Sequence, residues 1–203
     1  ENSFMRKAAD TLKTIGDNAF SNNYNMKNFK IPEGVTTIGA YAFNSLWGIT
    51  EIEIPASVES LAQGSFQWCG IVEKITFAPG SHLKEIAGGA FYQCEKVKQI
   101  VLPDSITQIA FKDCKSLEEI VLPEGISKIE AAAFYGESAD FKVHYKGSEE
   151  QWNAIDIIWS NYKNGGNNDV LKQEGVVDYN YAPADDLPDD VDFDSDASWM
   201  GSV

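Results

Sequence analysis

Basic residues are scarce in this 203-residue chain, and long apolar runs are missing. Its 16 Lys and Arg stand against 31 Asp and Glu, which gives a formal net charge of −15. Proteins that contact phosphates need clusters of Lys and Arg, and the sequence contains none. We therefore do not expect nucleic acid or an anionic membrane surface as a partner. No apolar run approaches the roughly 20 residues of a membrane-spanning helix, so membrane insertion is not expected either.

Histidines and catalytic motifs are also few. The two histidines, His82 and His144, fall in different repeats, and their separation does not fit a zinc site. No GxSxG, HExxH, phosphate-binding-loop or dinucleotide-binding motif occurs. The sequence therefore predicts no enzyme, no cofactor and no metal site.

Cysteine is limited to three residues, and each follows a phenylalanine by three positions: Cys69, Cys94 and Cys114. We expect them to form one column in a stack of repeats and to be buried as small apolar side chains. Parallel Cβ vectors in such a column suit a disulfide poorly. A reactive thiol needs a base nearby, and no Cys/His pair recurs.

One six-residue motif recurs several times along the chain, at a spacing of about 23 residues. It reads IGDNAF, IGAYAF, LAQGSF, IAGGAF and IEAAAF, and a second block of the type LEEIVLP lies between the copies. Its phenylalanines are at positions 20, 43, 66, 91, 111 and 134. Self-similarity at a fixed period is typical of stacked supersecondary units, which usually present a surface to a partner rather than a catalytic cleft.

The block 117–134 shows how one repeat forms one coil. Ile120 and Leu122 alternate with Val121 as in a short strand with one buried face, and Pro123 ends that strand because it has no N–H to donate. Further on, Ala133-Phe134 combines a small residue that allows close approach with a ring that fills the core. We therefore predict a curved solenoid of about six coils, with short parallel strands on its concave face. Turns, 3₁₀ segments or second short strands would form the outer arcs.

Two copies depart from the regular length. The fifth copy has lost three residues before Ala110-Phe111, and the third has gained residues within ITFAPGSHLKEI at 75–86. Because length changes in repeats usually fall in loops, we expect distortion of the outer arc and an unbroken strand ladder.

The combination of IGxxAF, Cys three residues later and a strand block ending in Pro resembles the BspA-like leucine-rich repeats of bacterial cell-surface proteins. Residues 12–145 carry this resemblance. It implies a secreted or surface-exposed protein with a role in adhesion, and a host or bacterial surface protein as its partner.

The resemblance and the change in composition suggest three regions. Residues 1–145 would form the repeat array, 146–181 a C-terminal cap, and 182–203 a flexible acidic tail. In the cap, Ser148 and Gln151 fit a capping box, and Trp152 and Ile155 would cover the last coil. The tail contains alternating aspartates that hint at a calcium loop, but Ser195 and Gly201 replace the glycine and acid that such a loop needs.

The outward positions of the strands are the candidate binding surface, because this ladder is the usual docking face of leucine-rich repeats. One row of outward residues is Lys30, Glu53, Thr76, Val101, Val121 and His144. A flanking row is Asn28, Glu51, Lys74, Gln99, Glu119 and Lys142. Val101 beside Val121 forms a small apolar patch, which we predict as the contact centre. An ordinary solvated sheet face is the alternative.

Aromatic residues around the Ala-Phe turns allow a different ligand. These residues are Trp47, Trp68, Tyr41, Tyr92 and Tyr135. They could stack on sugars, which keeps glycan binding open, or pack over the outer arc. A structural spacer and an accessory domain of a secreted enzyme are the remaining alternatives to a protein-binding role.

Overall fold

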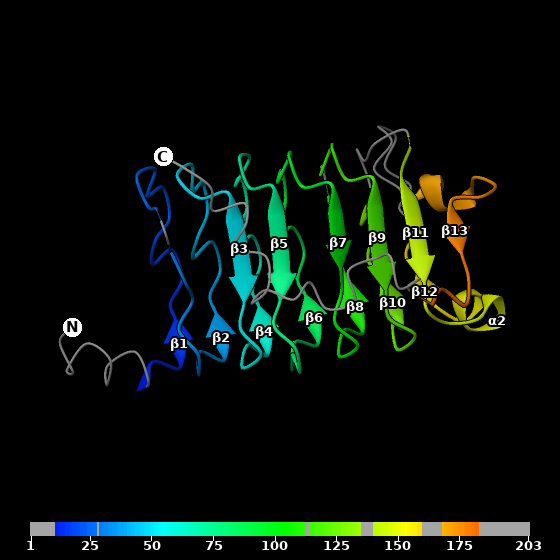
Figure 1. Ribbon diagram of the computed structural model, residues 1–203, viewed down its shortest axis with the longest axis horizontal. Coiled ribbons are helices and arrows are strands. Elements are labelled where there is room, and N and C mark those ends of the chain that lie inside the picture. The colour runs from blue at the N-terminus through cyan, green and yellow to red at the C-terminus, as the bar shows by residue number, and fades with distance from the viewer. Residues whose placement is uncertain (1–10, 28, 113, 135–139, 160–167, 183–203) are drawn as a thin grey trace, which may run out of the picture.

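The computed structural model describes residues 11–27, 29–112, 114–134, 140–159 and 168–182, and it is an elongated stack of coils (Figure 1). Each regular coil contributes strands to two parallel arrays, which run in opposite directions in the view. The predicted leucine-rich-repeat solenoid of parallel strands is confirmed. Of the outer-arc alternatives, the structure contains both turns and second short strands in its described coils.

Two-residue strands form a continuous seven-stranded parallel sheet, here called the short-strand sheet. Its strands in spatial order are β1 (Thr14–Ile15), β2 (Thr37–Ile38), β4 (Ser60–Leu61), β6 (Glu85–Ile86), β8 (Gln108–Ile109), β10 (Lys128–Ile129) and β12 (Asp156–Ile157). The second residue of most of these strands is a buried Ile or Leu. One apolar position in each coil therefore anchors this sheet to the core.

The second array holds the longer strands predicted from the sequence. β3 (Glu51–Ile54) pairs with β5 (Lys74–Phe77) in one sheet, and β7 (Gln99–Val101), β9 (Glu119–Leu122), β11 (Lys142–Tyr145) and β13 (Val177–Asp178) form another. The expectation of an unbroken ladder is therefore wrong on this side, because β5 and β7 belong to different sheets. The break follows the coil that carries the extra residues at 75–86.

A stack of phenylalanine rings fills the centre of the array. The rings of Phe20, Phe43, Phe66, Phe91 and Phe111 follow one another with centroid separations of 5.1–5.6 Å and interplanar angles of 3–15°. Those from Phe43 to Phe111 are fully buried. The three-residue deletion in the fifth copy shortens the turn between β8 and Phe111, because β8 is followed directly by Ala110-Phe111. The ring of Phe111 nevertheless stacks on Phe91 like the others.

The turns that carry the phenylalanines form a third ladder between coils. The backbone N–H of Phe20 donates to the carbonyl of Ala42, that of Phe43 to Ser65 and that of Phe66 to Ala90, at 2.7–2.8 Å. Two positions before every one of these phenylalanines except Phe111 the backbone is left-handed, at Asn18, Tyr41, Gly64, Gly89 and Ala132 (φ 56–70°). A tight corner at that point turns the chain from the short-strand sheet into the arc.

The cysteines form the expected buried column, and none of the three is in a disulfide. Each Sγ lies 3.3–3.5 Å from the carbonyl oxygen of a Phe in the preceding coil, namely Phe43, Phe66 and Phe91. Burial raises the pKa of Cys69 to about 12, and it raises the pKa of Cys94 well above the usual value. Cys69 and Cys94 are therefore neutral thiols, and all three cysteines join one coil to the next through these contacts.

The segment after β11 covers the end of the core. α2 (Glu149–Asn153) begins at Ser148 with the predicted capping box, and its Trp152 packs edge-on against Tyr145 at 5.3 Å. Beyond β12 lie the 3₁₀ helix η1 (Asp169–Lys172) and β13. No helix in the described part of the chain has both the length and the apolar character of a membrane span.

Asn168 supplies the hydrogen bonds that a further coil would have made. Its side-chain oxygen accepts from the N–H of Phe134 at 3.1 Å, the bond that other phenylalanines make to the next coil. Its amide nitrogen donates to the carbonyls of Glu130 and Ile158 at 2.9 and 3.2 Å. This fully buried side chain thus ends the Phe-turn ladder.

Candidate functional site

The long strands bring the predicted binding residues into two rows. In the outer row Glu53 pairs with Thr76, and Val101, Val121 and His144 are consecutive partners. In the flanking row Glu51 pairs with Lys74, and Gln99, Glu119 and Lys142 are consecutive partners. Lys30 precedes the first long strand, and Asn28 lies outside the described residues. The gap between β5 and β7 divides both rows.

The N-terminal part of this face is open and carries charges of both signs. Lys30 Nζ lies 3.8 Å from Glu53 Oε2, with exposed side-chain fractions of 86% and 57%. Glu51 is also exposed, and Lys74 is half-buried. Exposed ion pairs contribute only about 0–1 kcal/mol, so such charges can exchange partners at little cost.

Only one of the two valines of the predicted apolar contact centre is exposed. Val101 is 53% exposed, whereas Val121 is 1% exposed and stands apart from the main apolar core. Val121 lies beside His144, whose ring packs against Tyr181 with a centroid separation of 4.5 Å. Burial, followed by the negative charges of Glu119 and Asp178, raises the pKa of Tyr181, which fits a ring lying across the outer face of β9 and β11.

The other C-terminal members of the two rows are engaged within the molecule. His144 Nδ1 lies 3.1 Å from a carboxylate oxygen of Asp178, and only 15% of the His144 side chain is exposed. Lys142 Nζ donates to the carbonyl of Gly175. Glu119 accepts from Gln99 Nε2 at 2.9 Å. The candidate surface therefore shrinks to Lys30, Glu51, Glu53, Lys74, Thr76, Gln99 and Val101, which we call the open strand face.

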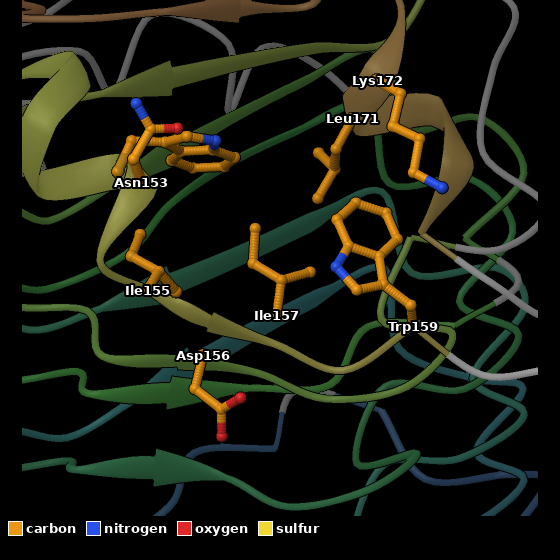
Figure 2. Close-up of a pocket in the computed structure, with 8 residues that line it drawn as sticks. Asn153, Ile155, Asp156, Ile157, Trp159, Leu171 and Lys172 are labelled. Atoms are coloured by element: carbon orange, nitrogen blue, oxygen red, sulfur yellow. The ribbon is translucent and has the colours of Figure 1, made fainter.

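A hollow that the sequence did not indicate lies between α2, β12 and η1 (Figure 2). Its volume is about 380 Å³, and its apolar wall includes Ile157, Trp159 and Leu171. Lys172 Nζ lies 4.3 Å from the centre of the Trp159 ring and 2.7 Å from Asp169 Oδ1. Among the described residues that line the hollow, Lys172 is the only cation, and it is paired with Asp169.

Metal ligands do not converge in the part of the chain that the structure describes. Among residues 11–27, 29–112, 114–134, 140–159 and 168–182, no three His, Cys, Asp or Glu side chains come close enough to hold a metal ion. The acidic tail and its alternating aspartates lie outside the described residues, as does Tyr135.

Comparison with known proteins identifies the family to which these repeats belong. Residues 13–142 match six copies of the model for the BspA type leucine-rich repeat region. The chain belongs to this family. No curated protein matches the chain.

Two solved structures of leucine-rich-repeat proteins are similar to it. A leucine-rich cell-surface protein from Faecalibacterium prausnitzii is 36% identical over 63% of this chain and 34% of its own length, with a TM-score of 0.58. A leucine-rich-repeat protein from Eubacterium ventriosum is 29% identical over 63% of this chain and 41% of its own length, with a TM-score of 0.47. The chain thus spans about a third to two fifths of the length of these relatives.

Proposed function

We propose that this chain is a non-enzymatic binding module of a secreted or cell-surface bacterial protein, and that a protein partner docks on the open strand face. Membership of the BspA type repeat family supports this, as does likeness to a protein described as a cell-surface protein. The observation that carries the proposal is Val101, a valine that is 53% exposed on β7, the strand that also presents the exposed amide of Gln99.

The backbone of this face is suited to binding because it is already ordered. Strand pairing fixes the side chains of β3 against those of β5, and those of β7 against those of β9. A partner therefore pays little for ordering the backbone, which is one of the main costs of association. Glu51, Glu53 and Lys74 would set orientation and selectivity, because complementary charges contribute more to specificity than to affinity.

Matched variants can test the proposal. Glu53→Lys and Val101→Glu alter the open strand face. Glu59→Lys and Thr107→Glu make the same changes in charge at exposed positions directly before β4 and β8. Immobilised protein would be offered host extracellular-matrix proteins and surface extracts of co-resident bacteria, at low and high salt.

We expect the wild type and both controls to retain one defined protein, and the two face variants to lose most of it. Equal retention by all four variants would remove the open strand face from consideration. A structural spacer, the main alternative, would retain no protein in any form.

The carbohydrate-binding and accessory-domain alternatives involve a different surface. Trp47, Trp68, Tyr41 and Tyr92 lie in the turns after the short strands, and none of them is on a long strand. The same variants would leave such an activity unchanged.

A further inference from the structure

The turns around the first three phenylalanines contain no charged residue. Asp, Glu, Lys, Arg and His are all missing from 18–25, 39–50 and 60–72, in a chain of which 23% is charged. Asn, Gln, Ser and aromatic residues take their place. This neutral edge is distinct from the open strand face, where Glu and Lys predominate.

Three large aromatic side chains are exposed on this edge. Tyr24 is 56% exposed, Trp47 51% and Trp68 47%. Tyr24 and Trp47 occupy the same position in successive coils, four residues after the Phe, and Trp68 lies in the third coil. A Cβ at Gly70 would lie 3.8 Å from Trp47 Cη2, so the indole of one turn reaches the next turn, which carries Trp68. We call these three residues the aromatic ridge.

Backbone hydrogen bonds fix the spacing of the turns that bear the ridge. The N–H of Asn22 donates to the carbonyl of Asn44, and that of Ser45 to the carbonyl of Gln67, both at 2.8 Å. Hydrogen-bonded strands are about 4.8 Å apart, so the aromatic residues project from turns separated by one such step. The ridge is therefore a regular feature of the stack.

A network of neutral polar side chains connects the first two of these turns. Tyr24 Oη donates to Asn22 Oδ1 at 3.1 Å, and Asn22 Nδ2 donates to Ser21 Oγ at 3.0 Å. Across the coil boundary, Asn44 Nδ2 donates to the same Ser21 Oγ at 3.4 Å, and Ser45 Oγ donates to Asn44 Oδ1 at 3.1 Å. Amide and hydroxyl groups are thus held in place beside exposed rings.

We propose that the aromatic ridge binds a neutral polysaccharide. The C–H faces of sugar rings pack on aromatic side chains, and sugar hydroxyls exchange hydrogen bonds with amides and hydroxyls, the two kinds of group present here. A neutral ligand matches an edge without charge. A protein contact is less well matched, because Arg is enriched beside the aromatic anchors of protein interfaces, and these turns contain no Arg.

Affinity electrophoresis in native gels can test this with the whole chain. The probes are soluble mixed-linkage β-glucan, arabinoxylan, galactomannan and glycogen, with polygalacturonate as an anionic comparison. We expect at least one neutral polysaccharide to retard the protein equally at low and high salt, since its binding releases no counterions, and polygalacturonate not to retard it.

Trp47→Ala and Trp68→Ala should each weaken this retardation by about tenfold or more, the loss typical of a central aromatic contact. Trp159→Ala is the matched control, because this tryptophan is 42% exposed in the C-terminal segment. Glu53→Lys should leave polysaccharide binding unchanged, which separates this proposal from protein binding on the open strand face. Unchanged thermal melting of the Trp68 variant would show that its fold is intact.

Two results would overturn the proposal. One is the absence of retardation by all four neutral polysaccharides. The other is equal retardation of the wild type and both ridge variants. If the ridge variants instead lose a captured protein while no polysaccharide binds, the aromatic ridge is a protein contact.

Discussion

Removing a ring from the middle of the phenylalanine stack should cost far more stability than removing the ring at its N-terminal end. Phe66 is fully buried between Phe43 and Phe91, at centroid distances of 5.1 and 5.6 Å. Phe20 is 37% exposed and stacks in parallel on Phe43 alone, at 5.3 Å. The substitutions Phe66→Ala and Phe20→Ala are therefore chemically identical changes in different surroundings.

The expected difference follows from burial, because each ring has two ring neighbours: Phe43 and Phe91 for Phe66, and Phe29 and Phe43 for Phe20. Truncating a fully buried Phe to Ala typically costs about 3–5 kcal/mol, including the cavity that is left behind. Complete burial of such a side chain is worth about 1.5–3 kcal/mol, and roughly two thirds of that applies to Phe20. The neighbours of Phe20 can also relax toward solvent. We expect a loss of about 4 kcal/mol for Phe66→Ala and about 1–2 kcal/mol for Phe20→Ala.

Urea unfolding followed by circular dichroism and tryptophan fluorescence would measure both losses. A difference of at least about 2 kcal/mol with unchanged m-values would support the reasoning. A split transition in the Phe66 variant would also support it, because stability in a solenoid depends on the interfaces between neighbouring coils. Equal losses for the two variants would refute the view that stacking between coils holds the array together.

Four further predictions concern buried polar groups. Ser65→Ala should stabilise the protein by about 1 kcal/mol, because the Ser65 hydroxyl is buried without a hydrogen-bond partner among the described residues; a loss in urea unfolding would contradict this. Asn168→Ala should lower the free energy of unfolding by about 2–3 kcal/mol, because it leaves the Phe134 N–H and two carbonyls unpaired. An unchanged midpoint of urea unfolding would show that water replaces the amide. All three thiols should resist iodoacetamide at pH 8 in the native protein and react in denaturant, as mass spectrometry would show. The pKa of Cys69 is about 12 against 9.0 for an unperturbed thiol, so its contribution to stability is complete below pH 9. That contribution falls between pH 9 and 12 by up to about 1.4 kcal/mol per unit, and flat stability over this range would disprove it.

The sequence was sufficient to predict which residues share the strand face, because two local rules determine this. Side chains alternate across a strand, and a fixed repeat places equivalent residues on neighbouring strands. Glu53 therefore meets Thr76, and Gln99 meets Glu119, as the pattern indicated. The same periodicity predicted the phenylalanine stack and the cysteine column.

What the repeat could not reveal is which of these residues a distant segment covers. Val121 looked as exposed as Val101, because both are outward valines at equivalent positions. Only Val101 is exposed, since Tyr181 from the C-terminal segment lies against His144 beside Val121. A contact made by a segment outside the repeats leaves no trace in their periodicity. The periodicity therefore predicted which residues point outward from the strands, but not which of them are exposed.

The irregular coils show why such a stack tolerates changes in repeat length. Successive regular coils are joined by the short-strand sheet, the long strands and the Phe-turn ladder, and the pairing of the long strands is interrupted between β5 and β7. Where β5 and β7 separate, β4 still pairs with β6, and Phe66 still donates to the carbonyl of Ala90 at 2.8 Å. Where the fifth copy has lost three residues, β7 still pairs with β9. Neighbouring coils therefore stay in contact even where one of the hydrogen-bond ladders between them is interrupted.

This redundancy has a consequence for binding. The separation of β5 from β7 divides the open strand face into one part with Glu51, Glu53, Lys74 and Thr76 and another with Gln99 and Val101. A partner that uses both parts must span a place where strand pairing no longer fixes the spacing of the side chains. Glu53→Lys and Val101→Glu probe opposite sides of that gap. Loss of capture by only one of them would assign the partner to a single part of the face, whereas loss by both would require a contact that bridges the break.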